Sequence, residues 1–473
     1  MMEPTAWAEQ HFGSIDLGDI RRTSRLVRIA ASAAAFPAGT VTKVFAEDAE
    51  RQGAYDFLES PHVKADALEE GLGRTVAARC ASEGRILVAV DGSSLSFVDR
   101  EGTRGLGAIG SYAAGGLGLK VISALALNSS GVPLGLLRQV FWRRPVHRPT
   151  NRRRSSERPI DKKETKHWLD AVLTSVERIR SVSGAPGITF LIDREGDSAA
   201  MLSTLVGTGH SFIVRGNWDR VVAADDGRPW KLRDLIAYQK VLGSYEVELP
   251  AGPGRAARTA KVSLRVANIV LPLKDPVTGR ELGIHLSAVN AREMIDRPAG
   301  EDALDWLLLT NAKVTTFKEA RASVSNYALR WRIEEFHRAW KSGHCNVEQS
   351  QLRSEQALRK WALVLAAVAS RVERLKLLAR ETPQVPADVE FSEIELHALV
   401  LLKRRSKKKT ETIPDAVPSI GQATLWLAEL GGYTGKSSGG PPGATTISRG
   451  LFKLRAAADA IAAFLAKDDD ENG

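Results

Sequence analysis

The sequence predicts a multidomain α/β protein in which helical domains flank an α/β core that carries a β-rich insertion. Two short apolar runs, ILVAV at 86–90 and GITFLI at 187–192, are typical of buried central strands. Between residues 211 and 310, short β-type runs such as YEVEL and KVSLRVANIVL follow one another. Helical periodicity dominates before residue 82 and after residue 318.

The length and composition are those of a folded protein with polyanionic partners. The 473 residues suffice for two to four domains of about 150 residues each, and 43% hydrophobic residues exclude disorder as the main state. The longest apolar run, at 361–369, is too short to span a bilayer, and we expect no signal peptide. Because Cys80 and Cys345 cannot build a disulfide framework, we expect a cytoplasmic protein. The net charge of +10 favours polyanions.

The N-terminal domain is predicted to be helical and to span residues 1–82. Apolar residues recur at helical spacing in LGDIRRTSRLVRIAASAAAF, and Pro37 ends this helix. A further helix is expected at 66–82.

The core is predicted at 83–375, with the β-rich insertion at about 211–310. The turn signal NSSG at 128–131 separates two apolar runs and predicts a β-hairpin. Two prolines shortly after residue 380 mark the start of a C-terminal helical domain, which we place at 376–473.

Positive charge is concentrated in two segments. Residues 143–166 hold ten Lys or Arg and three acids, with prolines between them, which predicts a mobile basic loop. The second segment is KRRSKKK at 403–409.

Two aspartates follow the two apolar strands. Asp91 ends ILVAV and precedes GSS, a turn signal, while Asp193 ends GITFLI and precedes REGD. Reactive groups gather at the carboxyl ends of strands in open α/β sheets, and hard oxygen ligands suit Mg²⁺ or Mn²⁺. The alternative is that each aspartate only caps a strand end or a turn.

A helix predicted at 326–343 has a compact ionisable face opposite an apolar face. On a helical wheel Tyr327, Arg330, Glu334 and Lys341 fall within an arc of about 60°. Glu334 can ligate a metal, while Arg330 and Lys341 can bind phosphate oxygens. The alternative is a solvated amphipathic helix with an Arg330–Glu334 ion pair.

The same helix contains Glu334-x-x-His337, which is half of a di-iron motif. Because a second copy is missing, we expect His337 on the helix surface or in contact with DNA. Three carboxylates around two metal ions suit phosphodiester chemistry, in which one ion activates the nucleophile and the other stabilises the leaving oxygen.

The chain resembles the Tn-five-type transposases of the IS-four family, which are bacterial cut-and-paste transposases. The resemblance covers nearly the whole length and rests on LGDIRRTSRLV, QGAYDFL, DGSSLSF, DREGD, DWLLLT and YALRWRIEEFHRAWKSG. The last segment matches the family's Y-R-E-K signature, with the spacing Y-x2-R-x3-E-x6-K complete.

This resemblance implies an RNase-H-like catalytic core with a DDE triad of Asp91, Asp193 and Glu334. The triad would bind two Mg²⁺ ions, for which Mn²⁺ can substitute. The β-rich insertion would lie between the second and third triad residues.

The resemblance also implies DNA contacts in two regions. Near the cleavage site, Trp306 would stack on a flipped base, although a core tryptophan beside a strand is the alternative. The other implied contacts are Tyr327, Arg330, Lys341 and Arg215 near the cleavage site, and Arg21, Arg22 and Arg25 on transposon-end DNA.

The function implied is a DNA transposase that binds terminal inverted repeats as a homodimer. It would nick one strand, form a hairpin, and join the released 3′ ends to target DNA. We expect double-stranded DNA as partner, no membrane contact, and association with the nucleoid when bound to DNA. The alternatives are a catalytically silent DNA-end-binding regulator and a metal-dependent nuclease that never joins strands.

Overall fold

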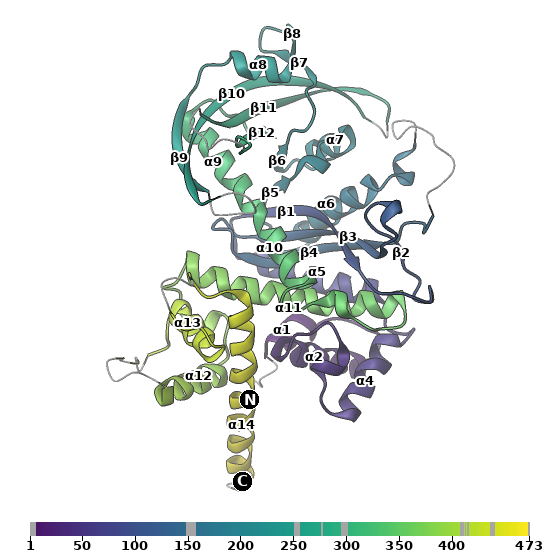
Figure 1. The fold of residues 1–473 in the computed structure, drawn as a ribbon, viewed down its shortest axis with the longest axis vertical. Helices are drawn as coiled ribbons and strands as arrows, with labels where there is room; N and C mark the ends of the chain where they lie inside the picture. The colour runs from purple at the N-terminus through teal and green to yellow at the C-terminus, as the bar shows by residue number, and fades with distance from the viewer. Residues whose placement is uncertain are drawn as a thin grey trace.

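The structure is a computed structural model with a large mixed sheet and with helical N- and C-terminal regions that lie together on one side of it (Figure 1). It describes residues 6–147, 158–249, 256–275, 278–294, 301–406, 411, 413, 416–435 and 440–471, with side chains up to Leu465. Within these residues, none of the helices combines the length and the apolar character that crossing a membrane requires.

The N-terminal region is a cluster of helices. The Asp19 carboxylate caps the second helix by accepting from the Arg21 backbone N–H at 2.9 Å, and its apolar face, including Leu26 and Ile29, is buried. The helices are α1 (Ala6–Phe12), α2 (Ile20–Ala35), α3 (Val41–Val44), α4 (Asp48–Glu59) and α5 (Ala65–Cys80).

The described strands form one twelve-stranded sheet with the path β2-β3-β1-β5-β6-β12-β11-β10-β7-β8, while β4 pairs with β3 and β9 with β10. The strands β1, β5 and β6 are parallel, and β3 is antiparallel to both β1 and β4. The strands are β1 (Arg85–Ser96), β2 (Gly107–Ala108), β3 (Leu117–Leu127), β4 (Pro133–Trp142), β5 (Gly187–Ile192), β6 (Ser211–Arg215), β7 (Val221–Ala224), β8 (Pro229–Lys231), β9 (Gly243–Leu249), β10 (Arg258–Lys274), β11 (Glu281–Glu293) and β12 (Asp305–Thr310).

The predicted β-hairpin is confirmed and joins β3 to β4. The Asn128 side chain accepts from the backbone N–H groups of Ser130 and Val132, which fixes the turn. The predicted turn at GSS is wrong, because β1 continues to Ser96. Residues 91–96 pair with β3, which satisfies their backbone groups in a ladder.

The β-rich segment predicted at 211–310 extends the core sheet. Its first strand, β6, pairs parallel with β5, and β12, β11, β10 and β7 follow in order. It also holds the short helix α8 (Leu232–Tyr238).

Both faces of the sheet are covered. In β1, Val88 and Val90 belong to a core with α6 (Thr165–Arg180) and α7 (Ala199–Gly207), whereas Leu87 and Ala89 face the core of α10 (Arg332–Lys341) and α11 (Glu355–Glu381). This alternation follows from the period of two in a strand.

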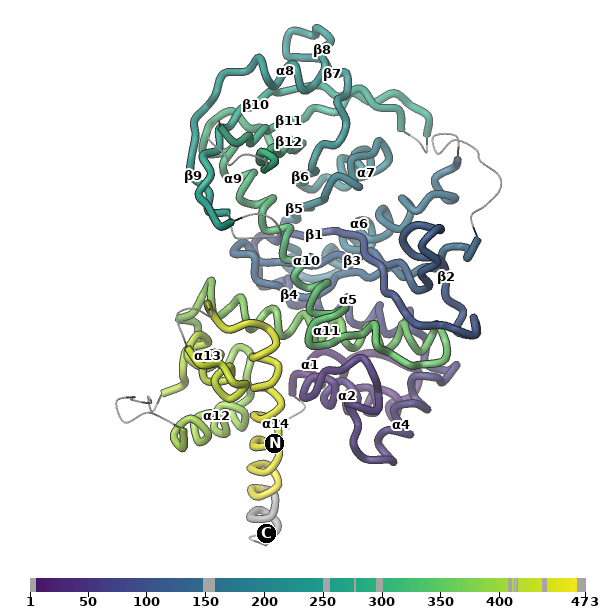
Figure 2. Tube along the Cα trace, viewed as in Figure 1, coloured from purple at the N-terminus to yellow at the C-terminus, as the bar shows by residue number. Residues whose placement is uncertain are grey.

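Helix α11 connects the sheet to both helical regions (Figures 1 and 2). The Trp361 indole N–H donates to the Gly39 carbonyl at 2.8 Å, and the buried Lys360 ammonium donates to two carbonyls at the end of α4. The second half of α11 packs with α12 (Glu393–Ser406), α13 (Ile420–Leu430) and α14 (Ala444–Glu471). It therefore runs across residue 376, where we placed a domain boundary, and the domain division stays a prediction.

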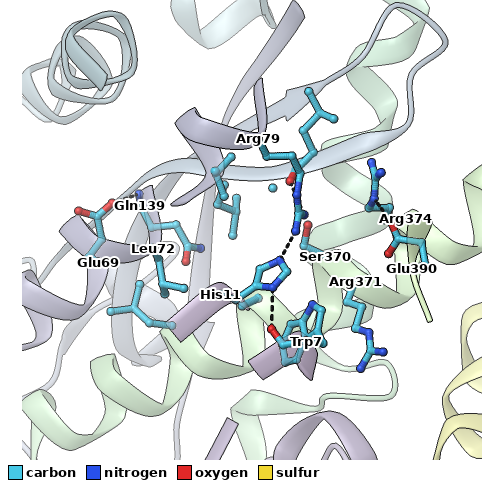
Figure 3. A pocket seen from close by; sticks show the side chains of 16 residues that line it. Trp7, His11, Glu69, Leu72, Arg79, Gln139, Ser370, Arg371, Arg374 and Glu390 are labelled. Atoms are coloured by element: carbon cyan, nitrogen blue, oxygen red, sulfur yellow. Dashed lines mark hydrogen bonds and ion pairs between the residues drawn. The ribbon is translucent and has the colours of Figure 1, made fainter. Parts of the chain in front are cut away.

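A pocket lies where α1, α5, β4 and α11 meet (Figure 3). Burial lowers the pKa of His11 to about 3, so this imidazole is neutral. Its Nδ1 donates to the Trp7 carbonyl at 2.8 Å, and its Nε2 accepts from Arg79 at 2.5 Å.

Glu69 joins α5 to the core through a buried ion-pair network. Its carboxylate accepts from Arg178 of α6 at 2.9 Å on each oxygen, from Arg138 of β4, and from the Gln139 backbone N–H at 3.0 Å. Glu69 is 5% exposed and Arg178 is 3% exposed, so removing either residue would leave the charge of the other buried without its partner.

Candidate active site

Asp91 and Asp193 lie beside each other at one edge of the parallel strands. Val90 of β1 is the register partner of Ile192 of β5, and each aspartate is the next residue. Neighbouring strands are about 4.8 Å apart, so the two carboxyl groups share one edge of the sheet. The Asp193 carboxylate accepts from the Glu195 backbone N–H at 2.8 Å, which caps the 3₁₀ turn Arg194–Gly196.

The helix predicted at 326–343 is interrupted. Helix α9 (Phe317–Ala328) starts with a capping box at Thr316 and Glu319 and is followed by a 3₁₀ turn at Leu329–Trp331 before α10 begins. The wheel assumed one continuous helix, so its angles do not apply across this turn. Arg330 and Glu334 still lie near the aspartates.

Arg330 connects this helical segment to the carboxylates. It donates to Glu334 at 2.6 Å, and another of its guanidinium nitrogens lies 3.8 Å from an Asp91 oxygen. The Arg330–Glu334 ion pair is therefore present, and Arg330 is 8% exposed.

The pKa of Asp91 is raised to about 7. Burial is the main cause, the charges of Asp193 and Glu334 add to it, and Arg330 opposes it. Three carboxyl groups thus repel one another electrostatically at this edge. Among the residues described, however, no three His, Cys, Asp or Glu side chains converge closely enough to hold one metal ion.

We expect the Asp91→Asn variant to change how stability depends on pH. The native pKa of about 7 exceeds the unfolded value of about 3.9, so the native state binds the proton more tightly and wild-type stability falls as pH rises between these values. As the pH rises from 5 to 8, the free energy of unfolding of the variant should therefore increase by about 2 to 3 kcal/mol relative to that of the wild type. Urea unfolding in metal-free buffer at several pH values measures this difference. If the stability of the two proteins depended on pH in the same way, the raised pKa of Asp91 would be contradicted.

An aromatic and cationic cluster adjoins the carboxylates. The rings of Trp306 and Tyr327 meet edge to face at 5.2 Å, Arg215 lies 5.9 Å from the Trp306 ring centre, and Arg330 lies 5.8 Å from that of Tyr327. The Tyr327 hydroxyl is buried without a hydrogen-bond partner among the described atoms, and burial raises its pKa. Trp306 packs against the core but remains partly exposed, so it is not a fully buried core tryptophan.

His337 is a site residue that the sequence analysis placed wrongly. It is 7% exposed, its Nε2 lies 3.2 Å from the Ser123 hydroxyl, and its Nδ1 lies 3.9 Å from Asp91. Ser123 is the register partner of Asp91 on β3 and also accepts from Gln139 at 3.3 Å. Since α10 packs on this face of the sheet, the histidine points inward, and burial lowers its pKa to about 3.

The remaining predicted contacts lie outside this cluster. Lys341 is 3.8 Å from Glu348. Arg21 is exposed and pairs with Asp19, Arg22 donates to the Leu17 carbonyl at 3.0 Å, and Arg25 lies over Gly53 of α4. These three arginines belong to α2, on the other side of α11 from the sheet (Figure 1), so the structure does not bring them to the carboxylates.

The two basic segments are described in part. Of 143–166, residues 148–157 lie outside the described residues, and the rest includes a 3₁₀ turn at Ile160–Lys162 and the start of α6. Of 403–409, residues 407–409 lie outside, and Lys403 is buried in ion pairs with Glu411 and Glu429. That lysine is therefore a structural residue of α12.

Residues 4–63 match a family model described as transposase DNA-binding. The matched segment contains α1 to α4 and with them Arg21, Arg22 and Arg25. The match supports a transposase whose partner is DNA, and it places three predicted end-binding arginines in the matched region.

Proposed function

We propose that the protein is a cut-and-paste DNA transposase of the Tn-five type within the IS-four family. It binds terminal inverted repeats, cleaves them by nicking and hairpin formation, and joins the 3′ ends to target DNA. The observation that carries this proposal is that Asp193, Glu334 and Arg330 all lie near enough to Asp91 to shift its pKa, in a chain whose N-terminus matches a transposase DNA-binding model.

The strand arrangement supports an RNase-H-like core. Strands β4, β3 and β1 are antiparallel neighbours, and β5 and β6 continue the sheet parallel to β1. Two of the three carboxylates follow the parallel pairing of β1 with β5, which is where reactive groups gather in such sheets.

The donor set fits divalent cations. Carboxylate oxygens are the ligands of Mg²⁺ and Mn²⁺. Burial is the main cause of the raised pKa of Asp91, and the negative charges of Asp193 and Glu334, which a cation would offset, add to it. Asp91, Asp193 and Glu334 would hold two ions, with Glu334 leaving its pair with Arg330. When bound, such ions lower the pKa of the attacking water or 3′-hydroxyl and stabilise the leaving oxygen.

The chain's own residues would position DNA around this edge. Arg330 and Lys341 would supply cationic groups to phosphates, and Tyr327 lies beside Arg330, which is 5.8 Å from its ring centre. Partly exposed Trp306, flanked by Arg215, offers a ring on which a flipped base could stack.

We further propose a homodimer on DNA, in the cytoplasm and associated with the nucleoid. Helix α14 exposes Phe464 and Leu465, apolar side chains that a second copy could cover.

A cleavage and joining assay tests the proposal. A supercoiled donor plasmid carrying both native ends is incubated with Mg²⁺ or Mn²⁺ and wild-type protein or the Asp193→Ala variant. We expect hairpin-ended excision products and joined products with wild type, and neither with the variant. Excision without any joined product would instead indicate a nuclease that never joins strands.

One observation favours the silent DNA-end-binding regulator as a second candidate. In the described arrangement Glu334 is paired with Arg330, and no three acidic, histidine or cysteine side chains of the described residues converge on a metal position. Specific end binding without cutting under either metal would support this regulator over the transposase.

A further inference from the structure

A groove lined by cations lies where β4 ends and α6 begins. Its walls come from the end of β4, the 3₁₀ turn before α6 and the first residues of α6. The cationic lining consists of Arg143, Arg144, Arg158, Lys162, Lys163 and Lys166.

The positive charge of this groove is only partly neutralised. Its two acidic lining residues are already paired, Glu164 with Arg144 at 2.6 Å and Asp161 with Lys162 at 3.7 Å. The other four cations have no carboxylate partner within 4 Å among the described residues. The surface therefore suits a ligand with several regularly spaced negative charges.

The groove has fixed walls. Trp142 and His167 stack with ring centres 4.2 Å apart and planes 18° apart. Arg144 also donates to the Gly110 carbonyl at 3.3 Å, which joins the segment after β2 to the groove. The stacked rings and the Arg144 hydrogen bond give the backbone of the groove a defined shape.

The groove is close to the catalytic carboxylates. Trp142 is the register partner of Lys120, and Lys120 pairs in turn with Ser94, to whose hydroxyl it donates at 3.0 Å. Ser94 is three residues after Asp91 on the same strand, which is about 10 Å along it.

The groove and the aromatic cluster lie on opposite sides of Asp91. In the strand order, β3 and β4 are on one side of β1, and β6 and β12, which carry Arg215 and Trp306, are on the other. The matched DNA-binding segment, residues 4–63, contributes no lining residue to the groove. Cationic surface thus approaches the carboxylates from two directions.

We propose that this groove binds the phosphate backbone of the target duplex. The inference rests on the proposed function, because joining requires the donor end and a second duplex at the carboxylates together. The donor end has its contacts on the aromatic side and in the N-terminal helices, which leaves the groove for the target. Phosphate contacts carry no sequence information, so this binding is independent of target sequence.

The first test separates cutting from joining. In the variant Arg143→Gln/Lys163→Gln/Lys166→Gln, we expect end cleavage within about twofold of wild type and joining to target reduced at least about tenfold. The matched control Arg228→Gln/Lys231→Gln/Lys240→Gln removes three exposed cations near β8 and α8 and should leave both steps unchanged. Equal loss of cleavage and joining would assign the groove to the donor end and overturn the proposal, as would unchanged joining.

A second test needs no catalysis. Binding of a duplex lacking transposon ends is followed by fluorescence anisotropy at several salt concentrations. Loss of three phosphate contacts should reduce the slope of log K against log salt by about 2.7 in the groove variant and leave it unchanged in the control. If the slope is unchanged in both variants, the groove does not bind the duplex, even if the wild type cuts DNA. A reduced slope with an inactive wild type would instead refute the proposed transposase activity alone.

Discussion

Replacing Glu334 by Gln will lower the rate of end cleavage by at least about a thousandfold, which corresponds to about 4 kcal/mol of transition-state stabilisation. Gln keeps the size of the side chain and can still accept from Arg330, but it removes the negative charge that we assign to metal binding. End binding, measured by gel shift, should change less than about threefold.

Glu335 provides the matched control for this variant. It is the next residue, pairs with Arg332 at 3.2 Å and Lys376 at 3.6 Å, and takes no part in the carboxylate group. Glu335→Gln should therefore cut at close to the wild-type rate. If Glu334→Gln cuts as fast as Glu335→Gln, the triad assignment is wrong.

Replacing Glu69 by Ala will lower the free energy of unfolding by about 3–5 kcal/mol. The substitution leaves Arg178, which is 3% exposed, and Arg138 without their shared buried carboxylate and also frees the Gln139 backbone N–H. Urea unfolding followed by tryptophan fluorescence measures the change.

The neighbouring Glu70 is the control here, because it also pairs with Arg178 but is 43% exposed at its side chain. Glu70→Ala should cost less than about 1 kcal/mol. Equal losses in the two variants would show that burial does not set the strength of this network.

Local patterns were sufficient to predict the helical character of the two terminal regions, two of the central strands and the β3–β4 hairpin, but they did not predict α6 and α7. They also located the aspartates, since each follows the last residue of the parallel pairing between β1 and β5, although β1 itself continues past Asp91. What local patterns missed depends on pairing between distant segments. The continuation of β1 past Asp91 needs β3 beside it, and the joining of the β-rich segment to the core sheet needs β6 beside β5.

Two of the predictions that were wrong concern the site. His337 points inward toward Ser123 beneath α10, and its spacing from the apolar Ile333 and Trp340 is the sequence signal for this burial. The wheel assumed ideal geometry, whereas the 3₁₀ turn at Leu329–Trp331 interrupts the helix beside the sheet. The roles of the triad and of the DNA contacts stay predictions until the variants are measured.

The attachment of the N-terminal helices to α11 has a consequence for the DNA itself. Trp361 and Lys360 hold the Gly39 and α4 carbonyls, and Glu69 ties α5 to the sheet, so the matched segment has a fixed orientation to the carboxylates. With a fixed orientation, the recognised sequence and the scissile bond must both face the protein at the same time, which depends on the helical turn of the DNA between them. Inserting five base pairs between the recognised sequence and the scissile bond turns the DNA by about half a helical turn, and the bond then faces away from the carboxylates. Inserting ten base pairs turns the bond back toward the carboxylates but moves it about 34 Å along the DNA axis. For the proposed transposase, the spacing between the recognised sequence and the scissile bond is therefore constrained by the fold of the protein.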